Sequence, residues 1–437
     1  MNCLKKVIFG LFVFTCIAMQ TAAHESHDAR HWEIASPDPD RVFLTFYGDP
    51  ATSRAVTWRT DTSINQAYAE IAPATPGPSF PSKAQQYEAT TQPLTLEDEN
   101  KPNNITTHYH SAVFEKLKPD TLYAYRVGDG NKRWSEWIQF RTASDKPEPF
   151  RFMYFGDAQN DVHSRWSRVI RMAHRTAPDA AFAIHAGDLV NGAHNDREWA
   201  EWMTAGGHLH AETTGVPVTG NHEYGKGKQS IQWRPQITVP VEESLPEELH
   251  ESVYSFDYQG VQIIVLNSCR LFEAQSAYLE RKLGEGDYKW RVVTFHHPVF
   301  SPSRGGDPKT RQQWKPILEK MGVDLVLQGH DHTYARGHTP KRTTTGEPTN
   351  TPGTIYVTSV SGPKMYKIKQ EGLDKFQKED GLVTAKTGVN TQFFQVIDVK
   401  DGRLEYRAYT ATGSLYDAVA IEKDDAGNKK LVVIPVE

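Results

Sequence analysis

Cysteine is scarce in this sequence of 437 residues, which contains three: Cys3, Cys16 and Cys269. If a short leader is removed, the first two go with it, and Cys269 then has no partner for an internal disulfide. Cys269 follows the apolar run 261–266, and the sequence places no activating group beside it, so we expect a buried, unreactive thiol. Without disulfides, the fold must be stabilised by its hydrophobic core and by any bound metal.

Long apolar runs and basic runs are also missing. The mean hydropathy is −0.59, which excludes a protein with many membrane spans. Asp and Glu total 54 against 49 Lys and Arg, for a formal net charge of −5, so a broad cationic face that binds nucleic acid is not expected. The content of 38% hydrophobic and 11% aromatic residues is typical of a globular chain, and the length favours two or three domains.

The first 23 residues have the pattern of a secretory signal peptide. Two lysines supply positive charge, residues 7–19 form an apolar stretch too short to span a bilayer comfortably, and small residues precede a cleavage point near Ala23. We therefore expect a secreted or periplasmic protein with no membrane span after cleavage. Two alternatives stay open: a lipoprotein acylated on Cys16, which the preceding threonine disfavours, and an uncleaved anchor.

Residues 24–145 are predicted to form an all-β domain. Residues 41–46 and 53–58 alternate apolar and polar side chains, as half-buried strands do. Segment 117–128 contains a Leu-x-Pro-x-Thr-x-Tyr turn and a tyrosine-rich strand, and segment 134–142 follows it. This pair is similar to the last strands of a fibronectin type III module, a sandwich of two sheets that usually carries no chemistry itself. Residues 145–149 are interpreted as a linker.

Residues 146–437 show a different pattern, in which short apolar segments alternate with helical ones. Helices are expected over 164–174, 274–283 and 310–320, the first with apolar side chains along one face. This alternation predicts a layered α/β domain. The expected strands are 151–156, 180–186, 215–219, 261–267, 290–295, 323–328, 354–360, 392–398 and 403–410.

Polar clusters follow five of these strands, and this pattern predicts a metal site. Side chains at the carboxyl ends of strands in an α/β sheet gather at one edge and bind ligands there. Their oxygen and imidazole groups, without thiolate, suit Mn, Fe or Zn at a reactive site better than a structural zinc. The five clusters offer more candidate ligand side chains than one ion binds, so we expect two ions and a bridging carboxylate. The clusters are Asp157-Ala158-Gln159, Asp188-Leu189-Val190-Asn191, Asn221-His222-Glu223, His296-His297 and His330-Asp331-His332.

In their order, these clusters resemble the motifs of the calcineurin-like metallophosphoesterases, and the fibronectin-like domain before them is similar to the purple acid phosphatase branch. The resemblance implies an all-β sandwich of fibronectin type III type followed by an α/β metallophosphoesterase domain with α/β/β/α layers. It also implies six metal ligands, two for the first ion, one bridging and three for the second. In that order they are Asp157 and His332, then Asp188, then Asn221, His296 and His330.

Neighbouring residues take supporting roles in this interpretation. The resemblance implies that His222 and His297 face the phosphoryl group, and a protonated His222 can donate to the leaving oxygen. We expect Glu223 to orient His222 or its loop, and Asp331 to act similarly near His330. Two ions would neutralise the phosphoryl oxygens and lower the pKa of a shared water, whose hydroxide would attack phosphorus in line with the departing oxygen.

The sequence departs from the purple acid phosphatase pattern at two positions. The residue three after the bridging aspartate is a tyrosine in that branch, whose phenolate binds ferric iron and gives the colour, but here it is Asn191. The residue two after the first aspartate is usually glycine in the purple enzymes and histidine in other branches, but here it is Gln159. Gln159 and Asn191 are therefore additional candidate ligands, with water as the alternative. We expect a colourless centre that favours divalent ions or a mixed pair.

These features predict an exported phosphoesterase with two metal ions (Fe, Mn or Zn) that hydrolyses phosphomonoesters in the manner of an acid phosphatase. Phosphodiester or nucleotide hydrolysis at the same centre is the close alternative. An alternative of another class is a catalytically inactive cell-surface binding protein with the sandwich as its adhesive module, against which the complete ligand set argues. The expected partner is a phosphate ester. The family includes homodimers, so the oligomeric state stays open.

Overall fold

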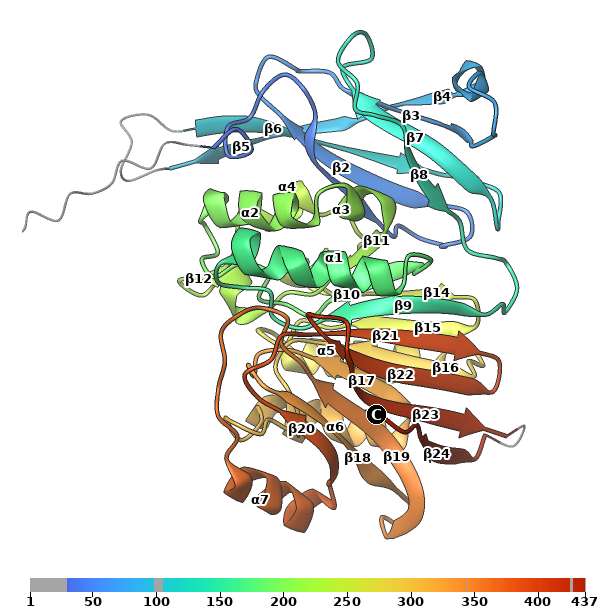
Figure 1. Cartoon of the computed structure of the whole chain (residues 1–437), viewed down its shortest axis with the longest axis vertical. Helices are drawn as coiled ribbons and strands as arrows, with labels where there is room; N and C mark the ends of the chain where they lie inside the picture. The colour runs from blue at the N-terminus through green and yellow to red at the C-terminus, as the bar shows by residue number, and fades with distance from the viewer. Residues whose placement is uncertain (1–29, 98–104, 344, 425–426, 437) are drawn as a thin grey trace, which may run out of the picture.

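The N-terminal domain is a sandwich of two sheets in the computed structural model, which describes residues 30–97, 105–343, 345–424 and 427–436 (Figure 1). One sheet has the strand order β1-β2-β6-β5 and the other β4-β3-β7-β8. Large apolar side chains such as Trp58, Phe114 and Phe140 form the core of this domain. Its strands are β1 (Asp40–Thr45), β2 (Arg54–Thr60), β3 (Tyr68–Pro73), β4 (Gln85–Glu88), β5 (Thr90–Leu96), β6 (Ile105–Phe114), β7 (Leu122–Gly128) and β8 (Ile138–Arg141).

The second domain contains two further layers of sheet. The first has the order β24-β23-β22-β21-β9-β10-β11, and the second has the order β14-β15-β16-β17-β19-β18-β20. The first is built from β9 (Phe150–Phe155), β10 (Phe182–His185), β11 (Thr214–Pro217), β21 (Phe393–Lys400), β22 (Arg403–Thr410), β23 (Leu415–Lys423) and β24 (Lys429–Val433). The second is built from β14 (Tyr254–Tyr258), β15 (Val261–Val265), β16 (Trp290–Thr294), β17 (Leu325–Gln328), β18 (Tyr334–Arg342), β19 (Pro348–Thr358) and β20 (Val383–Gly388).

Helices cover the outer sides of these two sheets. Figure 1 shows α1 to α3 between the first sheet and the N-terminal sandwich, and α7 at the opposite end of the molecule. Residues of α5 and α6 share a second hydrophobic core with the second sheet. The helices are α1 (Ser167–Thr176), α2 (Asp196–Gly206), α3 (His208–Glu212), α4 (Trp233–Gln236), α5 (Phe272–Gly284), α6 (Lys315–Lys320) and α7 (Gln370–Asp380).

The sequence of β15 explains why this strand is buried on both faces. Ile263 and Val265 belong to the large core that also contains residues of the first sheet. Ile264 and Leu266 belong instead to the core that contains Leu279 of α5. Because side chains alternate along a strand, an unbroken apolar run gives two apolar faces, as is typical of parallel strands covered on both sides.

The two domains share one sheet. β1 lies parallel to β11, with Thr45 opposite Gly215, so the first sheet of the second domain continues into the sandwich. Gly215 is required there because a Cβ atom would lie 2.3 Å from Cζ of Phe43. Arg41 of the sandwich also donates to both carboxylate oxygens of Asp196 in α2, at 2.8 and 2.9 Å. The N-terminal domain therefore holds β11, the strand that leads to the third polar cluster.

The predicted fold class is confirmed: an all-β sandwich is followed by a layered α/β domain. Each strand predicted for residues 146–437 is present; β22 has the predicted bounds and the others are shifted by a few residues. The helix predicted over 164–174 starts later, because a wider π-type turn over Val162–Trp166 precedes α1. The predicted signal peptide, residues 1–23, lies outside the described residues. Within the described ranges, no helix is both long and apolar enough to cross a membrane. In the second domain, the sequence analysis did not predict a two-stranded sheet of β12 (Tyr224–Gly225) and β13 (Lys228–Gln229), nor β14, β18, β20, β23, β24, α2, α3, α4 and α7.

Candidate metal centre

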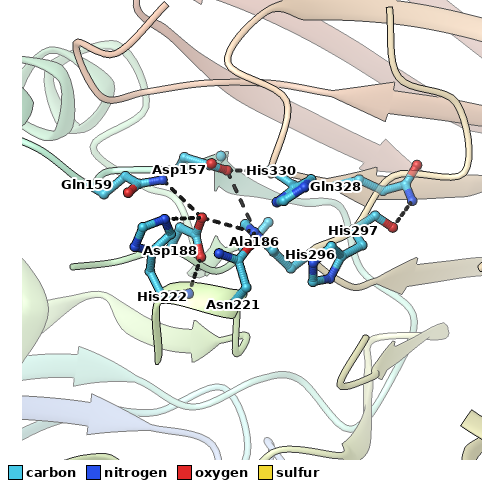
Figure 2. Close-up of polar contacts among 12 residues, drawn as sticks. Asp157, Gln159, Ala186, Asp188, Asn221, His222, His296, His297, Gln328 and His330 are labelled. Atoms are coloured by element: carbon cyan, nitrogen blue, oxygen red, sulfur yellow. Dashed lines mark hydrogen bonds and ion pairs between the residues drawn. The ribbon is translucent and has the colours of Figure 1, made fainter. Parts of the chain in front are cut away.

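Five loops carry the predicted ligands, and each loop follows the carboxyl end of a strand. Figure 2 shows dashed contacts from Asp188 to Gln159 and His222, whereas the amide of Gln328 points away from them. Strand ends at one edge of a sheet bring residues that are distant in sequence together. The loops after β9, β10, β11, β16 and β17 carry, respectively, Asp157, Asp188, Asn221, His296, and the pair His330 and His332.

Asp188, Asn221 and His296 form one half of the group. Nε2 of His296 lies 3.1 Å from Oδ2 of Asp188 and 3.3 Å from Oδ1 of Asn221. Nδ1 of His296 donates to the carbonyl oxygen of Ala186 at 2.9 Å. This hydrogen bond places a ring proton on Nδ1, so Nε2 is the nitrogen that faces the oxygens of Asp188 and Asn221.

Asp157, Gln159 and His332 form the other half. Oδ2 of Asp157 lies 3.3 Å from Nε2 of His332. Nδ1 of His332 donates to the carbonyl oxygen of Lys364 at 3.0 Å, so Nε2 again faces the group. The amide nitrogen of Gln159 lies 3.0 Å from Oδ2 of Asp188 and 3.1 Å from Nε2 of His332. Gln159 therefore lies between the predicted bridging ligand and a predicted ligand of the first ion.

Two glycines allow the ligand loops to approach one another this closely. A Cβ atom on Gly220 would lie 2.2 Å from Oδ1 of Asp188, and one on Gly329 would lie 2.3 Å from Oδ1 of Asp157. Only glycine fits at these two positions. Asp188 itself has a left-handed backbone conformation, with φ of +51°, and uncommon backbone conformations of this kind concentrate at functional sites.

Glu223 is buried beneath the turn that carries Asp188. Its Oε2 accepts from the backbone N–H groups of Asp188 and Gly220, at 2.9 and 2.7 Å. Its Oε1 accepts from the N–H groups of the two residues that follow Asp188. Burial, and then the neighbouring charge of Asp188, raises the pKa of Glu223 to about 8. Glu223 thus fixes the Asp188 turn, and the ring of His222 is oriented by another group.

That group is the main chain of Asn191. Nδ1 of His222 donates to the carbonyl oxygen of Asn191 at 2.6 Å, and Nε2 of His222 lies 4.0 Å from Oδ2 of Asp188. The side-chain oxygen of Asn191 accepts from the amide of Asn160 at 3.1 Å, and Asn191 is exposed. Of the two additional candidate ligands, Gln159 is therefore the one placed within the group.

His297 lies against His330, with ring centroids 4.4 Å apart. Its Nδ1 is 2.9 Å from Oγ of Ser268. Nitrogen atoms of His296, His297 and His330 lie within 4.8 Å of one another, and so do ligand atoms of Asp157, Asp188 and His296. His297 is therefore close enough to bind an ion as well as a phosphoryl oxygen, and the sequence analysis considered only the second role.

Asp331 supports a neighbouring loop. Its carboxylate accepts from the hydroxyl groups of Ser301 and Ser303, from the N–H of Ser303 at 2.9 Å, and from Oγ1 of Thr333 at 3.2 Å. Asp331 is fully buried and stands between His330 and His332 in the sequence. It therefore ties the loop after β16 to the segment that carries two predicted ligands. The sequence analysis assigned no role to Ser301 and Ser303 themselves, because neither belongs to a motif.

The charges within the group oppose one another. Burial raises the pKa of Asp157 to about 7, and Asp188 adds to this rise whereas His296 reduces it. Burial acts on Asp188 too, but His296 and His222 outweigh it and hold the pKa of that carboxyl well below its usual range. The pKa of His296 rises to about 9, because the attraction of Asp188 and Asp157 exceeds the effect of burial. Positive charge is therefore favoured between the two aspartates.

The donor set fits two metal ions. Oδ2 of Asp157 and Oε1 of Gln159 are buried, and neither has a hydrogen-bond partner in the part of the chain that the structure describes. A buried oxygen without a partner is costly unless a ligand satisfies it. Carboxylate and amide oxygens together with imidazole nitrogens suit Mn, Fe and Zn, and the donors do not distinguish among these metals.

Two family models match the chain. Residues 39–142 match the N-terminal domain of purple acid phosphatases, and residues 155–334 match the calcineurin-like phosphoesterases. Uncharacterized protein Rv2577 of Mycobacterium tuberculosis is 26% identical over 363 residues, which cover 72% of this chain and 65% of that protein. Purple acid phosphatase 21 of Arabidopsis thaliana is 31% identical over 246 residues, which cover 52% of this chain and 53% of that protein. The chain thus matches between about half and two thirds of the length of these relatives.

Solved structures share the fold. Purple acid phosphatase PPD1 from yellow lupin seeds has a TM-score of 0.73 at 18% identity, and the match covers 90% of this chain and 76% of that one. PhoD has a TM-score of 0.61 at 12% identity, with coverage of 92% and 93%. At such identities the likeness establishes the architecture of sandwich and layered domain.

Proposed function

Because the chain belongs to the calcineurin-like phosphoesterases and carries the N-terminal domain of the purple acid phosphatases, we propose that it is an exported phosphomonoesterase with a centre of two metal ions. The match to this family supports metal-dependent phosphoester hydrolysis as the reaction class. The preference for monoesters, the identity of the ligands and the export are our proposals.

One observation carries the proposal: the carboxylate of Asp188 contacts both halves of the group. Its Oδ2 lies 3.1 Å from Nε2 of His296 on one side and 3.0 Å from the amide of Gln159 on the other. Two ions close together need a carboxylate that faces both. We therefore assign Asp188 as the bridging ligand, with Asp157 and His332 on the first ion and Asn221, His296 and His330 on the second.

Gln159 completes the ligands of the first ion in this proposal. Its Oε1 is buried and unpaired among the described residues, while its amide nitrogen lies 3.1 Å from Nε2 of His332. A rotation of the carboxamide by half a turn exchanges these two atoms and directs the oxygen into the group. Gln159 then supplies a neutral oxygen to the first ion, which in purple enzymes is bound by a phenolate from the position of Asn191.

When bound, the two ions supply the positive charge that a phosphoryl group requires while it is attacked. The residues of the chain then position the substrate and move protons. His222 is held by Asn191 through Nδ1, so its Nε2 is the nitrogen that can donate a proton to the leaving alkoxide. His297, tied to Ser268, faces a phosphoryl oxygen.

Hydrolysis of two esters with and without ions tests this function. Protein loaded with Mn²⁺, Zn²⁺ or Fe should hydrolyse p-nitrophenyl phosphate faster than bis-p-nitrophenyl phosphate, and a chelator should abolish both activities. A faster diester reaction would favour the phosphodiesterase alternative. Ion-loaded protein that hydrolyses neither ester would contradict the proposal and favour a binding protein.

Two substitutions test the ligand assignment. Asp188→Ala and Asn221→Ala should each lower kcat by more than the roughly 10- to 100-fold that is typical of changes to residues behind the ligands. Asp374→Ala, an exposed change on α7, is the matched control and should keep wild-type activity. Near wild-type turnover by Asp188→Ala would show that the centre is assigned wrongly.

We also propose that residues 1–23 are removed during export, with cleavage near Ala23. N-terminal sequencing of protein recovered from the medium or the periplasm should give a start close to His24. Recovery of the exported protein with Met1 intact would contradict cleavage.

A further inference from the structure

Arg304 lies beside the candidate metal centre, and no step proposed above uses it. Its Nη1 is 2.8 Å from Nε2 of His330, and its Nη2 donates to the hydroxyl of Tyr366 at 2.6 Å. The guanidinium carbon also lies over the ring of Tyr366, 4.8 Å from the centroid. Arg304 itself is exposed. The exposed guanidinium of Arg304 is thus held by Tyr366 at the edge of the centre, which we call the rim.

The main chain around Arg304 is fixed to the ligand segment. The N–H of Arg304 donates to Oγ of Ser301 at 2.9 Å. The hydroxyl of Ser301 and the N–H of Ser303 in turn bind the buried carboxylate of Asp331. Because Asp331 directly follows His330 in the sequence, the position of Arg304 depends on the same segment that carries two candidate ligands.

The contact between Arg304 and His330 excludes the binding of an ion by His330. A guanidinium can only donate hydrogen bonds, so Nε2 of His330 accepts and the ring proton is on Nδ1. A neutral histidine that binds a metal gives one nitrogen to the metal and keeps its proton on the other. If Nδ1 binds the metal, Nε2 carries the proton and no longer accepts, and if Nε2 binds the metal, Arg304 is displaced.

We propose that Arg304 is a phosphate-binding residue whose contact with His330 would be given up when that histidine holds a metal ion. Once released, the guanidinium remains hydrogen-bonded to Tyr366 and binds the non-bridging oxygens of a phosphoryl group. This inference rests on the proposed phosphoesterase function, and it explains how the centre would distinguish phosphomonoesters from phosphodiesters. The planar fork of arginine matches phosphate oxygens in a bidentate manner.

The charge of the rim favours a dianionic phosphomonoester over a phosphodiester. Lys364 is close to the same tyrosine, with its Nζ 5.8 Å from the ring centroid of Tyr366. A phosphomonoester offers up to three non-bridging oxygens and two negative charges near neutral pH, whereas a diester offers two oxygens and one charge. Arg304 and Lys364 add positive charge outside the ions, so the second charge of the monoester has a partner.

Calorimetric titration of inorganic phosphate into Mn²⁺-loaded protein measures this role without any turnover. Arg304→Gln should weaken phosphate binding by about 10- to 100-fold, the range expected for a charge-assisted hydrogen bond. Arg304→Lys should give an intermediate loss, because it keeps the charge and loses the fork. Arg133→Gln, which removes an exposed arginine from the N-terminal sandwich, is the matched control and should bind phosphate as the wild type does.

Titration of Mn²⁺ itself separates this role from a structural one. Arg304→Gln should bind the second ion roughly 2- to 10-fold more tightly, because no guanidinium competes for His330. A purely structural role predicts the opposite, a loss of both ion and phosphate affinity. Either that result or phosphate binding within 2-fold of the wild type would overturn the proposal.

Kinetics on the two esters then tests the substrate class. Arg304→Gln should raise KM for p-nitrophenyl phosphate by about 10-fold or more and change KM for bis-p-nitrophenyl phosphate by much less. Equal effects on both esters would contradict selection for the dianion. If the ion-loaded wild type binds phosphate but hydrolyses neither ester, the phosphoesterase function fails, while the two titrations still decide the role of Arg304.

Discussion

At the scale of single residues, Glu223 links two of the loops that carry predicted ligands. One buried carboxylate accepts from the N–H groups of Asp188, Leu189, Val190 and Gly220. Its hydrogen bonds fix both Asp188, the proposed bridging ligand, and the turn before Asn221. Because Asp188 has a left-handed conformation, the turn needs these bonds to remain in place.

Glu223→Gln is expected to weaken ion binding by about 10- to 100-fold. It should also lower the free energy of unfolding by about 1–3 kcal/mol. Both oxygens of the carboxylate accept hydrogen bonds from main-chain N–H groups, and in glutamine one of these oxygens is replaced by an NH₂ donor that cannot accept. Competition with a chelator and urea denaturation measure the two effects. Glu285→Gln, an exposed change at the end of α5, is the control. Unchanged ion affinity in Glu223→Gln would refute the supporting role.

The absence of a tyrosine at position 191 predicts a colourless centre. Asn191 offers only a carboxamide, and that group is paired with Asn160. The tyrosine beside His332 is Tyr366, with ring centroids 4.7 Å apart, and its hydroxyl accepts from Arg304. Iron-loaded protein should therefore show no tyrosinate–iron band in its visible spectrum. A strong band that Tyr366→Phe removes would show that Tyr366 has taken the phenolate role.

At the scale of elements, the strands determine where the ligands meet, and the sequence showed most of this arrangement. Asp157, Asp188 and His296 each follow an apolar run that forms a buried strand, so their convergence was predictable. Lys364 and Tyr366 were not, because they lie in an irregular segment whose place depends on packing. Main-chain groups such as the carbonyl of Ala186 carry no side-chain signal at all.

Helices were predicted less well than strands. Pro316 in α6 and the few buried residues of α7 show why. The helix expected over 310–320 is divided into a π-type turn and α6, and Pro316 near the start of α6 lacks the N–H that a continuous helix needs. In α7, Leu373 and Phe376 are the buried residues, and this is too few to give a clear period of 3.6. Tertiary packing stabilises such helices more than their own sequence does.

The loop from Ser301 to Arg304 is expected to loosen when Asp331 is replaced. Asp331→Asn removes a carboxylate that accepts from Ser301, Ser303 and Thr333. KM for p-nitrophenyl phosphate should rise by about 10-fold with a smaller change in kcat, because the loop positions Arg304 and leaves the ligands in place. Steady-state kinetics and hydrogen exchange of residues 301–306 measure this. A fall in kcat with unchanged KM and unchanged exchange would contradict it.

At the scale of the whole molecule, the sandwich and the second domain are joined by more than a linker. β1 extends the first sheet of the second domain, and Phe43 of β1 contacts His210 of α3, with ring centroids 5.3 Å apart. The ring of His210 also stacks on Trp202 at 4.1 Å. The two domains were predicted from the change in strand and helix pattern along the chain, but their common sheet was not, because a single parallel pairing leaves no local pattern.

This junction predicts lower stability in acid. Burial lowers the pKa of His210 from its ordinary 6.5 to about 3, and burial likewise lowers the pKa of His185. The unfolded chain therefore binds more protons than the folded chain below pH 6.5, and stability falls as the pH drops toward 3. For His210 alone the loss between pH 7 and pH 5 is about 2 kcal/mol.

Thermal unfolding at a series of pH values tests this expectation. His210→Phe, which keeps an aromatic ring, should show a smaller fall in Tm between pH 7 and pH 5 than the wild type. The same substitution at exposed His208 of α3 should leave the fall unchanged. An equal fall in the wild type and in His210→Phe would show that His210 does not govern acid stability.

The central claim is that Asp157, Asp188, Asn221, His296, His330 and His332 hold two metal ions around one shared carboxylate. Anomalous X-ray diffraction from crystals of Mn²⁺- or Zn²⁺-loaded protein, collected at the absorption edge of the metal, tests it most directly. We expect two peaks about 3.5–4 Å apart on either side of Asp188. A single peak, or peaks that these side chains do not contact, would contradict the account.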